Sequence, residues 1–272
     1  MGTSSRWPGP GGRTDLAGEW TRLGKRASAW RPDSADSLAR LDDIAADHLD
    51  VLHRTLGENP AAFALYETAC SAGARLTTTA ADAWAQSRDG DDFATRFTAS
   101  VGGEGGTMAD AAVRRAAAAS AGRLLQTLEE RPEACGLPGR DSLAGDLFCL
   151  LYQWFFADVV AEFLRTVIAE KVKLVVPLLP AVDPEDHIVD WVAERVLKLL
   201  PNPCVEAAEL KEEVERVEGE VSGIEDPLGV LRLVAQGLVP RAVGRALGLL
   251  TDRDDQEATQ SDGATYVGEP AA

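Results

Sequence analysis

The chain has 272 residues, of which 45% are hydrophobic and 26% are charged, values typical of a folded globular protein with one large or two small domains. Its 27 Lys and Arg residues are outnumbered by 44 Asp and Glu residues, which gives a formal net charge of −17. A chain this acidic repels polyphosphate, and this argues against nucleic acid as a partner.

Charge is distributed unevenly along the chain. Residues 1–31 hold six basic and two acidic side chains, whereas residues 251–272 hold one basic and six acidic side chains. Residues 227–250 hold three basic and no acidic side chains, namely Arg232, Arg241 and Arg245. Two basic islands therefore flank an acidic body, and these three arginines are the candidates for contact with a partner or a membrane surface.

The N-terminal segment, residues 1–31, is rich in Gly, Pro and Arg, and we expect it to be largely disordered. Within it, Leu16, Trp20 and Leu23 share one helical face, which indicates a short helix around Trp20. The acidic C-terminal segment, residues 251–272, is expected to be a disordered tail.

Residues 32–137 are predicted to form an N-terminal helical half. Apolar residues recur at three- and four-residue spacing over residues 38–56, and Asn59-Pro60 then supplies an N-cap followed by proline at the first position of a second helix. A later helix, beginning at Met108, is opened by a capping box formed by Thr107 and Asp110.

Residues 138–250 are predicted to form a C-terminal helical half around one long apolar helix, residues 142–176. Its run from Leu147 to Ala157 has no charged side chain and must be hidden from water. A further helix is expected to begin at Pro184. Because caps, prolines and 3.6-residue periodicity recur and strand patterns are absent, we expect an all-α bundle of about eight helices around residues 142–176, with disordered tails.

The four cysteines are scattered, with no CxxC pair, and Cys149 lies inside the apolar run. These spacings predict neither a disulfide framework nor a zinc site. The N-terminus lacks the apolar core of a signal peptide, and no segment reaches the roughly 18 uninterrupted apolar residues of a membrane span. We therefore expect a reduced, soluble, cytoplasmic protein, with a residue usage typical of GC-rich bacterial genomes.

An apolar seam at alternating three- and four-residue spacing runs through residues 207–221: Ala207, Leu210, Val214, Val217 and Val221. Two heptads are too few to establish a coiled coil. Two interpretations stay open. The helix lies on the protein's own core, or it pairs with a second copy of the chain in a homo-oligomer.

The acid-free segment 227–250 is expected to be divided by Pro240 into two helices. Gly244 and Gly248 would let another helix approach closely. Three occupants of this segment are considered: the acidic body of the same molecule, a protein partner, and an anionic membrane surface.

Asp158, Glu162 and Arg165 are spaced four and three residues apart and form one charged strip on the central helix. We expect this strip to be the solvent-facing side of the helix, with Arg165 offsetting the two acids. The functional alternative is an acid–base pair beside an arginine in an apolar cleft, which makes these residues the catalytic candidates.

A metal site is considered at two pairs, Asp50 with His53 and His187 with Asp190, because each places a carboxylate and an imidazole on one helix face. A carboxylate-bridged di-iron site needs two Glu-x-x-His motifs and two further glutamates, a set that this chain lacks. We therefore expect no metal and no other cofactor.

None of the common catalytic motifs, such as the nucleophile elbow, the P-loop and the dinucleotide-binding fingerprint, occurs in the chain. The expected function is that of a non-enzymatic cytoplasmic interaction or adaptor protein with a protein partner. One alternative is a helical enzyme or small-ligand-binding protein that uses the Asp158 strip. A second is a peripheral membrane protein that uses residues 227–250.

Overall fold

The computed structural model describes residues 14–31, 36–130, 143–171, 184–218 and 227–250. Within these parts the chain forms nine α-helices and one 3₁₀ helix, and no strand. In chain order these elements are α1 (Thr14–Ala29), α2 (Ser37–Glu58), η1 (Ala62–Ala64), α3 (Leu65–Gln86), α4 (Gly90–Gly102), α5 (Met108–Glu130), α6 (Gly145–Lys171), α7 (Pro184–Leu197), α8 (Pro203–Glu218) and α9 (Pro227–Ala246). The predicted all-α fold is confirmed. Of residues 1–31, which the sequence predicts to be largely disordered, residues 14–29 form α1, while residues 1–13 lie outside the described part, as do residues 251–272.

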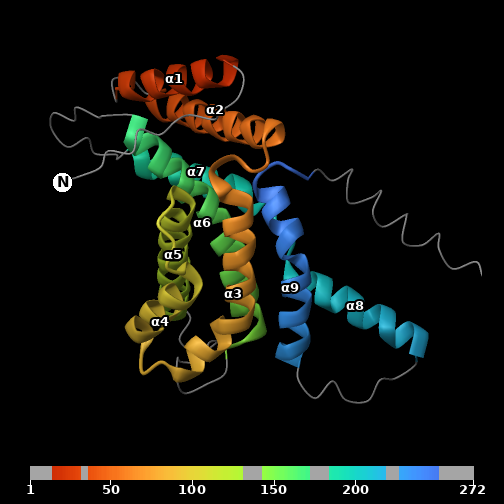
Figure 1. Cartoon of the computed structure of the whole chain (residues 1–272). Coiled ribbons are helices and arrows are strands. Elements are labelled where there is room, and N and C mark those ends of the chain that lie inside the picture. Colours follow the sequence, from red (N-terminus) through yellow and green to blue (C-terminus); the bar gives the residue numbers. More distant parts are fainter. Residues whose placement is uncertain (1–13, 32–35, 131–142, 172–183, 219–226, 251–272) are drawn as a thin grey trace, which may run out of the picture.

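Helix α6 is the centre of the bundle, as the apolar run predicts. It contacts α3, α5, α7 and α9, and every side chain from Phe155 to Leu164 is buried. Figure 1 shows α3, α5 and α9 standing side by side around it, with α1 and α2 lying across one end. The predicted end of this helix at residue 176 lies outside the described residues.

By length and composition, α6 is the one helix in the described part of the chain that could cross a membrane, over Gly145–Ala169. Of its apolar window, 83% is buried inside the protein. Such burial is what the core helix of a bundle requires, so the apolar composition of α6 is accounted for by its neighbours.

The predicted helix around Trp20 is present and extends over the whole of α1. Leu16, Trp20 and Leu23 are buried against the rest of the protein. The indole Nε1 of Trp20 donates a hydrogen bond to Oγ1 of Thr55 on α2 at 3.1 Å. One apolar face and one buried hydrogen bond therefore fix α1 on α2.

The predicted capping box at the N-terminus of α5 is confirmed. The backbone N–H of Asp110 donates to Oγ1 of Thr107 at 3.1 Å, and the backbone N–H of Thr107 donates to the Asp110 carboxylate at 2.9 Å. These two bonds form the predicted capping box, which satisfies donors that the first turn of a helix leaves unpaired.

Two predicted boundaries are wrong. Helix α3 begins at Leu65 and not at Pro60, because Phe63 (φ 62°) and Ala64 (φ 52°) adopt left-handed conformations that break the helix. Pro240 does not divide residues 227–250, since it lies inside the continuous helix α9. Val239 and its buried neighbours pack on the bundle and keep the helix intact, while Pro240 itself is on the exposed side.

Close packing of α3, α6 and α9 at Gly73 gives a first testable prediction. A Cβ at Gly73 would lie 2.5 Å from the ring of Phe156 and 2.9 Å from Val239. Both neighbours are buried, so Gly73→Ala is expected to overpack the core and to lower the free energy of unfolding by about 1–3 kcal/mol.

Gly122 of α5 is the matched control, because a Cβ there meets nothing within 4 Å. Gly122→Ala is expected to raise the free energy of unfolding by up to about 1 kcal/mol through higher helix propensity. Urea denaturation of both variants measures the two changes. Equal effects of the two substitutions would contradict the packing of α3 described above.

Candidate functional site

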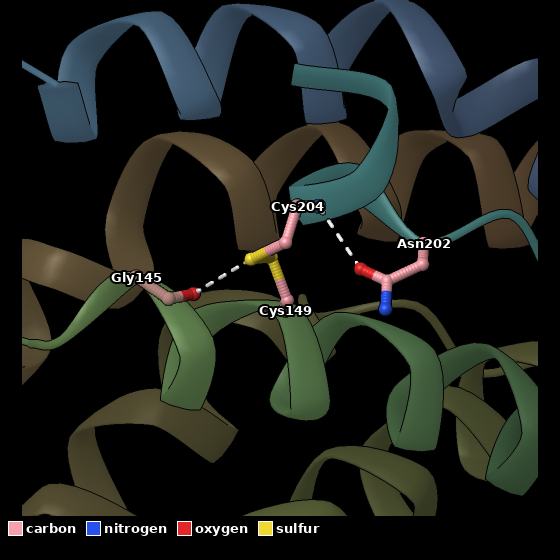
Figure 2. Close-up of a disulfide and its surroundings, with 4 residues drawn as sticks. All are labelled: Gly145, Cys149, Asn202 and Cys204. Atoms are coloured by element: carbon pink, nitrogen blue, oxygen red, sulfur yellow. Dashed lines mark hydrogen bonds between the residues drawn. A yellow bond between two sulfur atoms is a disulfide. The ribbon is translucent and has the colours of Figure 1, made fainter. Parts of the chain in front are cut away.

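Helix α8 begins at a covalent link to the central helix. Oδ1 of Asn202 accepts a hydrogen bond from the backbone N–H of Cys204 at 2.9 Å, and Pro203 occupies the first helical position. Cys204 forms a disulfide with Cys149 of α6, with the two Cα atoms 6.0 Å apart. Figure 2 shows the bond joining the first turn of α8 to α6.

The expectation of reduced cysteines without a disulfide is therefore wrong for this pair. Cys149 and Cys204 are separated by 55 residues, and only the fold brings them within bonding distance. In the described part of the chain, Cys70 is a free thiol. Disulfides persist mainly in oxidising compartments, so the disulfide counts against the predicted cytoplasmic location, which stays a prediction.

Beyond this link, α8 leaves the bundle. Ala207 packs against the core, and Oε1 of Glu206 lies 3.1 Å from Nη1 of Arg241 on α9. All residues from Ala208 to Glu213 are exposed, and Figure 1 shows α8 pointing away from the other helices. The predicted apolar seam therefore starts on the protein's own core and continues past its edge, where Leu210 is 49% exposed.

The exposed large apolar side chains in the described part of the chain are few, and most lie on or next to α8 and α9. Among the described residues, four of the five exposed large hydrophobic side chains lie on α8, just before it, or on α9: Leu199, Val205, Leu210 and Leu233. The fifth, Leu38, lies on α2. Singly exposed apolar residues are ordinary, and Leu210 stands out among these because it lies on the predicted apolar seam of α8.

The basic segment 227–250 packs largely on its own molecule. Helix α9 contacts α3, α6 and α8. Arg241 binds Glu206, and Nη1 of Arg245 donates to the backbone carbonyl of Leu199 at 3.4 Å. Arg232 is half-buried on the same helix. Contact of this segment with the body of the same molecule is thus present. Contact with a protein partner or with a membrane surface stays a prediction.

The charged strip of α6 does not face solvent, contrary to expectation. Asp158 is 3% exposed and Glu162 is 7% exposed. Helix α5 covers both, because Nε of Arg115 lies 2.9 Å from Glu162 and Nη2 of Arg123 lies 3.1 Å from Asp158. The strip is therefore one half of an ion-pair network between antiparallel helices.

Arg165, the third member of the strip, extends the network to α7. Its Nε lies 3.3 Å from Glu162, and its Nη1 lies 2.7 Å from Asp186. The three residues named as catalytic candidates are thus together in space, and each lies within ion-pairing distance of a side chain of the opposite type, acidic or basic. Such a network ties α5, α6 and α7 together and is a sufficient structural role.

Asp158 is the chemically unusual member of the network. Its Oδ2 is buried and accepts no hydrogen bond from the described residues. Desolvation by burial raises the pKa of Asp158 to about 7, with Arg123 opposing the shift and Glu162 and Asp190 adding to it. The carboxyl group therefore retains its proton close to neutral pH.

The residues considered for a metal site are held apart by other contacts. His53 approaches the backbone carbonyl of Ala246 on α9, with Nε2 3.1 Å from the oxygen. Asp50 binds Arg54, and His187 binds Asp42. In the described part of the chain, no three His, Cys, Asp or Glu side chains lie close enough to hold a metal ion together.

Comparisons of the chain with models of protein families, with curated proteins and with solved structures find no match.

Proposed function

We propose that the protein is a non-enzymatic helical adaptor that binds a protein partner through α8. The observation that supports this proposal is the exposure of every described side chain of α8 after Ala207, including Leu210 of the predicted apolar seam. Isolated helices of this length are marginal in water, and most helices in proteins are stabilised by packing an apolar face. A partner that covered Leu210 would supply the packing that the bundle does not.

A second candidate function is that of a helical enzyme or small-ligand-binding protein. It is favoured by one observation, the buried carboxyl group of Asp158 with a pKa of about 7. Groups that titrate near neutral pH are suited to general acid–base catalysis. The ion pairs to Arg115 and Arg123 support a structural role for the same residues, so the adaptor function is preferred.

The adaptor proposal is tested by substituting Leu210. Leu210→Gln keeps a high helix propensity but removes an apolar contact, and Leu38→Gln makes the same change at a residue that is 44% exposed on α2. The wild type and both variants are used as bait in affinity purification from cells of the native host, with quantitative mass spectrometry.

A partner that binds through α8 is expected to co-purify with the wild type and with Leu38→Gln, and to be depleted at least tenfold with Leu210→Gln. Circular dichroism should show the same helix content for all three proteins, because both leucines are exposed. Equal recovery of every co-purifying protein by both variants would refute the proposal.

A further inference from the structure

The two cysteines of the disulfide differ in exposure. Cys149 is 3% exposed near the start of α6, whereas Cys204 is partly exposed in the first turn of α8. A thiolate that approaches from solvent therefore reaches Sγ of Cys204 more easily than Sγ of Cys149. Disulfides with an exposed sulfur are the ones that reductants open readily, whereas fully buried structural bonds resist reduction.

The surroundings of Cys204 also suit its reduced form. The backbone carbonyl oxygen of Gly145 lies 3.4 Å from Sγ of Cys204, so a thiol at this position has a hydrogen-bond acceptor in place (Figure 2). Cys204 is the second residue of α8, where the helix dipole stabilises a thiolate. The nearby acid Glu206 is paired with Arg241. Stabilisation of reduced Cys204 makes the bond easier to open.

In its described residues, α8 has few other attachments. Pro203 is buried and Ala207 packs on the core, but all described side chains that follow are exposed. Glu206 and Arg241 are 33% and 34% exposed, and an ion pair between such side chains contributes little to stability. Helix α6, by contrast, contacts α3, α5, α7 and α9. Opening the disulfide therefore removes a main attachment of α8 and leaves α6 in place.

We infer that the disulfide is a reversible redox switch, which a dithiol reductant opens and which thereby releases α8 from the bundle. One thiolate of the reductant attacks Sγ of Cys204, forms a mixed disulfide and expels the Cys149 thiolate, which takes up a proton. The second thiolate of the reductant then attacks the reductant's own sulfur in the mixed disulfide and expels Cys204, which takes up a proton in turn. The protein gains two electrons and two protons, and the reductant leaves as a disulfide.

This switch goes beyond the proposed function and bears on two expectations. Disulfides in reducing compartments are usually transient or redox-sensing, so a reversible bond agrees with the predicted cytoplasmic location better than a permanent bond does. A released helix of 16 residues is marginally stable by itself and must be ordered again on binding. Reduction should therefore weaken binding of a partner to α8, a consequence that rests on the proposed adaptor function.

The first measurement follows the bond in the folded full chain. Dithiothreitol is added without denaturant, and the bond is quantified by alkylation and mass spectrometry of the peptides that contain Cys149 and Cys204. The rate of reduction is expected to rise in proportion to the dithiothreitol concentration, and oxidised glutathione should restore the bond. A rate independent of concentration would overturn the inference, because the bond would then open only after the protein unfolds.

Two variants with one thiol each identify the accessible sulfur. Cys149→Ala leaves the thiol of Cys204, and Cys204→Ser leaves the thiol of Cys149. In native buffer, iodoacetamide is expected to modify Cys204 at least tenfold faster than Cys149, because Cys149 is buried. Equal rates would show that Cys204 is not the preferred point of attack and would contradict the proposed step.

Release of α8 is measured with a glutamate-specific protease. Glu209 of α8 and Glu67 of α3 are both exposed, and cleavage after either residue requires its helix to open locally. Reduction is expected to accelerate cleavage after Glu209 at least tenfold, while the bond after Glu67 stays intact until that cleavage is complete. Cys204→Ser should behave like the reduced wild type without any dithiothreitol.

Two results of this digestion would overturn the inference. Unchanged cleavage after Glu209 in the reduced protein would show that α8 stays attached without the bond. Cleavage after Glu209 and Glu67 at the same rate would show a general loss of stability, and not the release of one helix. Circular dichroism of the reduced protein provides the control that the bundle is still folded.

The outcomes also separate the switch from the adaptor function. If Leu210→Gln loses the native partner while reduction leaves cleavage after Glu209 unchanged, the adaptor function stands and the switch is refuted. If reduction releases α8 while no co-purifying protein depends on Leu210, the switch stands and the adaptor function is refuted.

Discussion

Replacing Cys204 with serine is expected to lower the free energy of unfolding by about 4 kcal/mol, the value that chain entropy gives for a loop of this length. The bond to Cys149 closes a loop between residues 55 positions apart, and it thereby restricts the unfolded chain. Urea denaturation without reductant measures the change. Reduction of the wild type should produce a similar loss and leave Cys204→Ser unaffected.

Cys70 provides the control for this experiment, since it is a free cysteine. Cys70→Ser is expected to change the free energy of unfolding by less than about 1 kcal/mol, with or without reductant. Alkylation of the denatured, unreduced proteins gives an independent count, because Cys204→Ser should expose one additional thiol, that of Cys149. The absence of that thiol, with unchanged stability, would contradict the disulfide.

The second large effect concerns the dependence of stability on pH and the buried carboxyl group of Asp158. Its pKa is raised from 3.8 to about 7 in the folded protein. Between these values the folded state holds a proton that the unfolded state has released, so stability falls as the pH rises. The total decrease in the free energy of unfolding is roughly 4 kcal/mol and is complete above pH 7.

Asp158→Asn is expected to remove this contribution. The difference in the free energy of unfolding between the variant and the wild type should grow by several kcal/mol in favour of the variant as the pH is raised from 4 to 8. The reason is that the amide has no charge to desolvate. Arg123 of α5, Glu162 of α6 and Asp190 of α7 act on the same carboxyl group and are unchanged in the variant.

Denaturation curves at pH 4, 5, 6, 7 and 8 measure this difference. Asp146→Asn serves as the control, since it removes an exposed carboxylate from the same helix. The control should keep the wild-type dependence on pH. A constant difference between Asp158→Asn and the wild type across this range would show that Asp158 titrates normally.

The features that the sequence predicted correctly are those with local causes. The apolar run of α6 had to be buried, and the capping box at Thr107 involves residues three positions apart. Asn202-Pro203 starts α8 without having been predicted to do so, whereas Asn59-Pro60, for which a helix start was predicted, does not start α3. The outcome differs because Phe63 and Ala64, soon after Pro60, adopt the left-handed conformation. The residue types at these positions do not predict that conformation.

The features that were missed depend on contacts between distant segments. The sequence predicts that the strip on α6 faces solvent, because the residues of α6 do not indicate which other helix covers them. The arginines that cover it lie on α5, Arg115 being 47 residues before Glu162 and Arg123 being 35 residues before Asp158, and no spacing rule relates positions so far apart. The disulfide was missed for the same reason, since the sequence contains no measure of the distance between two cysteines.

The attachment of α8 at one end has a mechanical consequence. A rigid helix of 16 residues is about 24 Å long and acts as a lever whose pivot is its first turn. Tension applied at the far end therefore reaches Cys204 and passes through a covalent bond to Cys149, in the middle of the molecule. A load on this arm would therefore act directly on the central helix through the bond to Cys149.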